Sequence, residues 1–212
     1  MPRLTLDRQQ IVTEAVALLD AEGLDGVTTR KLAARLGVQS PTLYWHLPNK
    51  AALVTAIAER ILEQQFPELS SPTPEEPWQD WLIGLAERLR RALLAHPDGA
   101  RVISAAQLSL KMAAISELAM RTLVERGFPL RHARLIVLTV ERFTVGHALE
   151  EQAPRPDTEA QGFDMAAFTA EHPTVVAGIT EYFQPGRTAD DLFRDCLDLI
   201  IEGAATRAGP QS

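Results

Sequence analysis

The residues with the most distinctive chemistry lie in a short cationic segment near the N-terminus. Between Thr28 and Lys50 the sequence holds four basic residues and no Asp or Glu. From Ala51 onward it carries 15 Lys and Arg against 23 Asp and Glu, and the net charge of the whole chain is −7. Phosphate groups need positive charge only locally. This distribution predicts a small nucleic-acid-binding module on an acidic body, unless the basic residues cluster by chance.

Two short helices must position these cations. Thr28 or Thr29 can cap the first helix, and Gly37 can end it. Ser40 followed by Pro41 is typical of a second helix that begins with a capping residue and then proline. Two short helices joined by a tight turn form a helix-turn-helix unit, whose second helix fits the major groove of B-DNA.

The angle between the two helices depends on apolar residues, so we expect Leu43 and Val38 to be buried. A longer helix capped by Asn49 follows and reaches about Gln65. Four prolines in the segment 66–77 then indicate a linker.

The remaining periodic segments repeat at helical spacing. We expect helices at about 78–96, 99–107, 108–126, 129–152, 165–182 and 188–207, and a mobile loop at 152–162. No alternating run bounded by hairpin turns is present, which predicts an all-α fold. The expected domains are a helix-turn-helix DNA-binding domain at 1–49, a connecting helix at 50–66, and an effector-binding and dimerisation domain at 67–212.

Composition limits the environment of the chain. No run approaches the ~18 apolar residues of a membrane span, and no apolar signal-like run opens the sequence. The single cysteine, Cys196, excludes an internal disulfide and lies on an apolar stripe that is typical of a buried, inert thiol. We expect a cytoplasmic protein without membrane contact, cofactor or bound metal.

Several motifs resemble the N-terminal domain of TetR-family regulators, and of the tetracycline repressor subfamily in particular. They are TTRKLA at 28–33, LGV at 36–38, PTLYWH at 41–46 and NK at 49–50. Weaker colinear matches continue from WQD at 78–80 to LIIEG at 199–203. The resemblance therefore spans nearly the whole chain.

The resemblance implies roles in DNA recognition. Arg30 would reach a guanine edge, because its planar fork pairs with O6 and N7. Pro41 and Thr42 would lie against thymine methyls or nearby base edges. Ser40 stands where the tetracycline repressors carry a base-reading glutamine, so we expect a different operator. Phosphates would be contacted by Thr29, Tyr44, His46 and Lys50.

Other readings remain open for part of this set. Tyr44 and Trp45 could be core aromatics, and His46 could be a solvated helix end. Arg30 and Lys50 are hard to explain as core residues.

The resemblance also implies an effector pocket in the C-terminal domain, which in the tetracycline repressors binds a drug–magnesium chelate. Glu150 matches a glutamate near that metal, and His147 lies one turn earlier. Ile103 replaces the histidine and cannot ligate a hydrated cation. Five more pocket positions have changed, mostly from polar to apolar: Phe66, Leu85, Leu89, Ala106 and Gln107. We therefore expect a hydrophobic or aromatic effector rather than magnesium–tetracycline, although these side chains could instead pack a closed core.

Two apolar segments, 130–149 and 191–205, are wide enough to be buried on more than one side. The resemblance implies that they form a four-helix bundle in a homodimer, which would present two recognition helices to a palindromic operator. The expected function is a repressor released from double-stranded operator DNA by a small molecule. An activator or an effector-independent regulator remains an alternative. An enzyme is disfavoured, because no nucleophile elbow, phosphate loop or zinc motif is present.

Overall fold

The computed structural model describes residues 6–154 and 162–206, and within these ranges the chain forms eleven helices and no strand. The predicted all-α fold is confirmed. The helices are α1 Arg8–Gly26, α2 Thr29–Arg35, α3 Ser40–Tyr44, α4 Lys50–Gln65, α5 Trp78–Leu94, α6 Gly99–Ala105, α7 Leu110–Glu125, α8 Leu130–Gln152, α9 Met165–Glu171, α10 Pro173–Tyr182 and α11 Ala189–Ala205.

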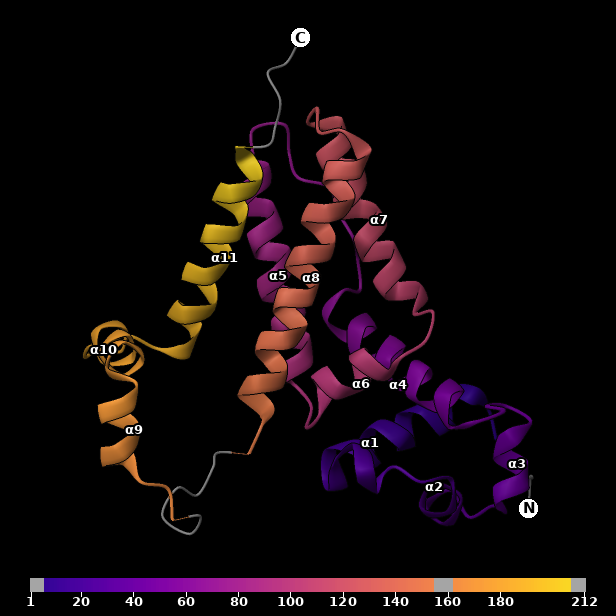
Figure 1. The fold of residues 1–212 in the computed structure, drawn as a ribbon. Coiled ribbons are helices and arrows are strands. Elements are labelled where there is room, and N and C mark those ends of the chain that lie inside the picture. The colour runs from indigo at the N-terminus through magenta and orange to yellow at the C-terminus, as the bar shows by residue number, and fades with distance from the viewer. Residues whose placement is uncertain (1–5, 155–161, 207–212) are drawn as a thin grey trace.

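The three N-terminal helices form a small head against the start of α4 (Figure 1). Asp7 opens α1 with a capping box, in which it accepts from the backbone N–H of Gln10 at 2.7 Å and the Gln10 side chain accepts from the Asp7 N–H. The predicted cap of α3 was wrong. Gln39 is the N-cap and makes no side-chain hydrogen bond, while Ser40 is already the first helical residue.

The body consists of α5, α7, α8 and α11, which run roughly side by side, with α6 between this bundle and the head (Figure 1). One buried cluster spans head and body and includes Ile11, Leu43, Ile57, Leu93 and Ala148. A second cluster fills the body between α5, α7, α8 and α11. The head therefore packs on the body through a continuous apolar core.

The predicted helix at 165–182 is divided into two. His172 has φ −127° and ψ 51°, and α10 begins at Pro173. Proline disfavours helical geometry in the residue before it, which explains the break. Helices α9 and α10 have no buried residue and lie beside the start of α11, away from the head (Figure 1). Most of the predicted loop at 152–162 lies outside the described residues.

The structure also tests what was expected of Cys196 and of membrane-spanning segments. Cys196 is only partly buried, which differs from the buried thiol expected from its apolar stripe. In the described ranges no single helix is long and apolar enough to cross a membrane, and α6 with α7 passes that test only as a pair bent by 87°.

Candidate nucleic-acid interface and effector site

Local capping builds the unit formed by α2, a turn and α3. The Thr28 hydroxyl accepts from the N–H of Lys31 at 3.2 Å and thereby caps α2. Gly37 ends the helix with φ +66°, a conformation that glycine adopts without penalty. Leu43 is 2% exposed and holds α3 against α2, as predicted, whereas Val38 is only partly buried.

The four basic residues of this segment divide into two pairs. Lys31 forms an ion pair with Glu22, and Arg35 forms one with Glu14 at 2.5 Å; both carboxylates belong to α1. Arg30 and Lys50 are exposed, and neither forms an ion pair with another residue in the described part of the chain. Two cations therefore remain available to an external anion.

The side chains on and around α3 are open to solvent. Tyr44 is 47% and Trp45 is 89% exposed, so the reading of these residues as core aromatics was wrong. Pro41 is exposed, and the polar residues Thr29, Ser40, Thr42 and His46 are partly exposed. All the predicted DNA-contact residues thus keep accessible surface. Trp45 is accessible as well, although the sequence analysis assigned it no contact.

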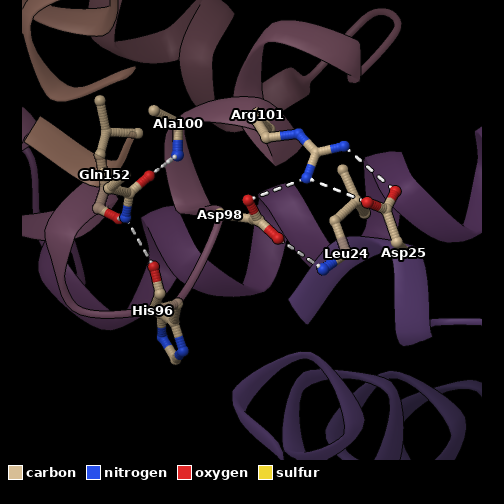
Figure 2. A network of polar contacts seen from close by, with 8 residues as sticks. Leu24, Asp25, His96, Asp98, Ala100, Arg101 and Gln152 are labelled. Carbon is tan, nitrogen blue, oxygen red and sulfur yellow. Dashed lines mark hydrogen bonds and ion pairs between the residues drawn. The ribbon is translucent and has the colours of Figure 1, made fainter. Parts of the chain in front are cut away.

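A polar junction fastens the head to the body (Figure 2). Gly23 interrupts α1 with φ +69°, and the backbone N–H of Leu24 donates to Asp98 Oδ2 at 2.8 Å. Arg101 extends the junction, because its guanidinium lies 3.1 Å from Asp25 and 3.0 Å from Asp98. The hydrogen bond from Leu24 lowers the pKa of Asp98 below its ordinary value, and Arg101 adds to this effect.

His96 and Gln152 continue the junction across three helices. His96 Nδ1 lies 2.6 Å from Asp20 Oδ1 of α1, and His96 Nε2 lies 2.9 Å from Gln64 Oε1 of α4. The Gln152 amide donates to the His96 carbonyl at 2.8 Å and accepts from the Ala100 N–H at 3.0 Å (Figure 2). This junction was not predicted from the sequence, because its partners lie far apart along the chain.

Helix α4 is also bonded to the segment that joins α6 to α7 and to the first turn of α7. The Thr55 hydroxyl donates to the Gln107 carbonyl at 3.1 Å and accepts from the Gln107 N–H at 3.0 Å. Glu59 accepts from the Lys111 N–H at 3.0 Å. Gln107 itself is exposed, so its backbone rather than its side chain makes this link.

The other predicted effector residues fall into two groups. Phe66 and Leu89 are buried, Leu85 is partly buried, and Ile103 and Ala106 pack on the same core from α6 and its C-terminal cap. The Arg88 guanidinium lies over the Phe66 ring at 4.6 Å. These apolar residues share one region of the body.

His147 and Glu150 do not join that region. His147 packs 5.2 Å from the Phe193 ring of α11 and lies 3.9 Å from Glu151. Glu150 is exposed. The donor set does not fit a magnesium chelate, because Ile103 offers no ligand atom. The described residues hold no group of three His, Cys, Asp or Glu side chains able to bind a metal.

A narrow cavity lies inside the body among apolar side chains. Its walls are Leu82, Leu85, Ala86, Leu89, Ile115, Ala119, Val137 and Val140, with Glu141 as the one charged residue. The hydroxyl of Ser116 on α7 donates to Glu141 Oε1 at 2.5 Å. Burial raises the pKa of Glu141. Glu141 was not among the residues predicted from the sequence, although an acidic residue within the apolar pattern of 130–149 was a signal.

A second surface lies between α8 and α11, where apolar side chains face solvent. Leu135 is 55% and Leu199 is 70% exposed. They border a groove of about 360 Å³ that Ile136, Thr139 and Ile200 also line. A contiguous group of exposed apolar side chains commonly marks an interaction site.

Comparison with known proteins assigns the chain to a family. The bacterial regulatory proteins of the tetR family match residues 11–57, and the tetracyclin repressor-like C-terminal domain matches residues 71–208. The class A tetracycline repressor protein of transposon 1721 from Escherichia coli is 38% identical over 202 residues, which cover 95% of this chain and 92% of the relative.

Two solved structures share the fold. A TetR variant from Acinetobacter baumannii AYE in complex with minocycline is 33% identical, covers 95% of this chain and 97% of its own, and has a TM-score of 0.72. BioQ with its double-stranded DNA operator is 25% identical, covers 95% and 99%, and has a TM-score of 0.71. The chain, which carries the same helix-turn-helix head and helical body, therefore belongs to the TetR family of DNA-binding transcriptional regulators.

Proposed function

We propose that this protein is a homodimeric repressor that binds a palindromic operator and leaves it when a small molecule occupies the body. The observation that carries the proposal is that Arg30 and Lys50, on either side of α3, are exposed cations without an ion pair among the described residues. Tetracycline repressors are among its relatives, which supports repression of transcription rather than activation.

Each exposed residue of the head has a proposed role. Arg30 reads a guanine edge, and Ser40, Pro41 and Thr42 lie against neighbouring bases. The register on the duplex is fixed by phosphate contacts from Thr29, Tyr44, His46 and Lys50. Residues 1–49 thus read DNA, 50–66 connect, and 67–212 bind the effector and the second subunit.

The dimer is proposed to form through α8 and α11. Burying the exposed Leu135 and Leu199 against the same residues of a second copy removes apolar surface from water, at about 25 cal/mol per Å². In this proposal the two-fold axis runs along this face and two α3 helices face the same side of the dimer, as an operator with two half-sites requires.

Release from DNA is proposed to pass through α4. An effector among the apolar body residues presses on α7 and α6, and the bonds from Thr55 to Gln107 and from Glu59 to the Lys111 N–H transmit that movement to α4. The head follows, because Asp98 and His96 fasten α1 to the body. A coupling of about 1–3 kcal/mol between effector and DNA is typical of such linkage.

The effector is proposed to be hydrophobic or aromatic rather than a magnesium–tetracycline chelate. Pocket residues fix a ligand through a few polar groups, and here the side chains that share the region are mostly aliphatic or aromatic. Tight, saturable binding of tetracycline in the presence of magnesium would contradict this part of the proposal.

The decisive experiment measures operator binding by fluorescence anisotropy with DNA selected by the purified protein from a random pool. We expect enrichment of a palindrome, saturation at one dimer per site, and an affinity that falls as salt rises. Addition of the effector should then lower the anisotropy. Failure to enrich any sequence would contradict the proposal. Enrichment only in the presence of a ligand would mean that the ligand promotes DNA binding instead of releasing the protein from DNA.

A further inference from the structure

We infer that the cavity beside Glu141 receives an amine or ammonium group, so that the effector is an otherwise apolar cation. The inference deepens the proposed ligand-responsive function and rests on it. Its basis is one juxtaposition: a carboxylate that forms no ion pair with another described residue, and that Arg134 reaches only at longer range, inside a cavity whose other walls are aliphatic.

Arg90, another charge of the body that is shielded from solvent, is paired. Arg90 binds Glu151 at 2.5 Å and Asp190 at 2.7 Å, and His96 faces Asp20 at 2.6 Å. Glu141 differs, because its one hydrogen bond comes from the neutral Ser116 hydroxyl and no ion pair links it to another described residue. Glu141 is only partly exposed, and acidic side chains are rarely shielded from water without a partner, so a cation from outside the chain would complete the site.

The apolar lining of the cavity strengthens an ion pair between Glu141 and such a cation. Leu82, Leu85 and Leu89 of α5 exclude water from one side, and Ile115 and Val140 exclude it from α7 and α8. An ion pair is stronger in such surroundings than at the surface, provided that the geometry satisfies both charges. Burial already raises the pKa of Glu141, and a bound ammonium would lower it again by stabilising the carboxylate.

A neighbouring hollow could hold the rest of the ligand, and the charges that line it favour a cationic ligand. Leu85 borders both the cavity and a hollow of about 260 Å³ beneath the linker between α4 and α5. The hollow contains two carboxylates, Glu76 and Asp80, and one cation, Arg88. Arg88 is occupied, since its Nε donates to the Gln65 carbonyl at 2.5 Å. The balance of charge along this route therefore favours a cation.

The size of the cavity limits what reaches Glu141. Its volume is about 20 Å³, which corresponds to roughly one water molecule. A primary ammonium group is of that size, whereas a ring requires Leu85 or Ile115 to move. We therefore place the ammonium at Glu141 and the apolar part of the ligand toward Leu85 and the hollow.

The test uses three probes with one phenylbutyl body and different heads: 4-phenylbutylamine, 4-phenyl-1-butanol and 4-phenylbutyrate. Binding to the DNA-free protein is measured by calorimetry for wild type, Glu141→Gln and Glu117→Gln. Glu141→Gln keeps the shape and removes the charge, and Glu117→Gln is the matched control because Glu117 is an exposed residue of α7. Circular dichroism verifies that all three proteins are folded.

We expect wild type and Glu117→Gln to bind the amine at least about tenfold more tightly than the alcohol, a ratio that corresponds to about 1.4 kcal/mol. The butyrate should bind least, and Glu141→Gln should bind amine and alcohol equally. Equal binding of amine and alcohol by wild type, an amine preference that survives in Glu141→Gln, or no measurable amine binding would each overturn the inference.

Operator binding by the same samples separates this inference from the proposed function. If the amine binds through Glu141 but DNA stays bound, the inference holds and the proposed release mechanism fails. If operator binding is intact while the amine preference is absent, the inference alone fails.

Discussion

Asp98 accepts a hydrogen bond of 2.8 Å from the backbone N–H of Leu24, across 74 residues of sequence. Both ends of this contact depend on unusual backbone. Gly23 breaks α1 with φ +69° and frees the Leu24 N–H, and Asp98 itself has φ +58°. A Cβ at Gly23 would lie 2.8 Å from Asp98 Oδ2, so the close approach of head and body requires glycine at this position.

Asp98→Ala should therefore destabilise the protein more than Asp98→Asn. Alanine removes the acceptor for the Leu24 N–H and is disfavoured at positive φ, which together cost about 2 kcal/mol. Asparagine tolerates that conformation and keeps an acceptor, so its loss should be below about 1 kcal/mol. Urea denaturation measures both differences, and equal losses for the two variants would contradict the assigned contact.

The same contact makes a contribution to the free energy of unfolding that depends on pH. The pKa of Asp98 is lower in the folded chain than in the unfolded chain, so its contribution is present at neutral pH and is lost as pH falls through the folded pKa. The difference in unfolding free energy between wild type and Asp98→Asn should shrink between about pH 6 and pH 3. A difference that stays constant over this range would show that the charge plays no part.

Unlike the Asp98 variants, Glu141→Gln should make the protein more stable than wild type at neutral pH. Burial raises the folded pKa of Glu141, while Arg134 opposes this effect from α8 and α5 presents only apolar groups to the cavity. Native stability therefore falls as pH rises through the interval above the unfolded pKa. We expect a gain of about 1 kcal/mol near pH 8 that shrinks toward pH 4. Thermal denaturation at both pH values measures it, and a destabilised variant at pH 8 would contradict the prediction.

Arg30→Ala should weaken operator binding by about 1–3 kcal/mol, because Arg30 has no ion pair within the described chain and is proposed to contact a base. Lys31→Ala is the matched control on the neighbouring residue. Lys31 is already paired with Glu22, so we expect its loss to change affinity by less than about 1 kcal/mol. Anisotropy at fixed salt compares the variants, and equal effects would refute the distinction between free and paired cations.

Leu199→Glu should prevent dimer formation, because it places a charge at the centre of the exposed face between α8 and α11. Loss of the dimer removes two-site binding, so operator affinity should fall by about 10²–10⁴. Leu110→Glu is the control, since Leu110 is exposed but lies at the start of α7. Sedimentation velocity reports the assembly state; a dimer that survives Leu199→Glu would exclude this face.

Trp45→Ala should leave the free energy of unfolding within about 0.5 kcal/mol of wild type, as expected for a surface residue. Its neighbour Leu43 is 2% exposed, and Leu43→Ala should lower stability by about 2–5 kcal/mol. Urea denaturation followed by circular dichroism compares the two. A large loss from Trp45→Ala would mean that its indole packs on something in solution.

The helices and the outline of the head could be predicted from the sequence because short-range rules govern them. Thr28, Gly37 and Asn49 act on backbone groups within a few residues, and all three do in the structure what the capping rules predict. The same kind of rule, applied to Pro173, would have divided the helix at 165–182. The cationic character of the segment 28–50 was likewise visible from residue types alone.

Only the tertiary structure decided which of these residues are free to act. Contacts with α1 neutralise Lys31 and Arg35 and leave Arg30 and Lys50 available. All four side chains carry a positive charge, so residue type alone could not separate the two pairs. Burial of Glu141 and the contact between Asp98 and Leu24 depend on helices far apart in sequence. Helical periodicity places a residue on one face of its own helix, but the partner of that face is set by how the helices pack, because desolvation and ion pairing depend on distance in space.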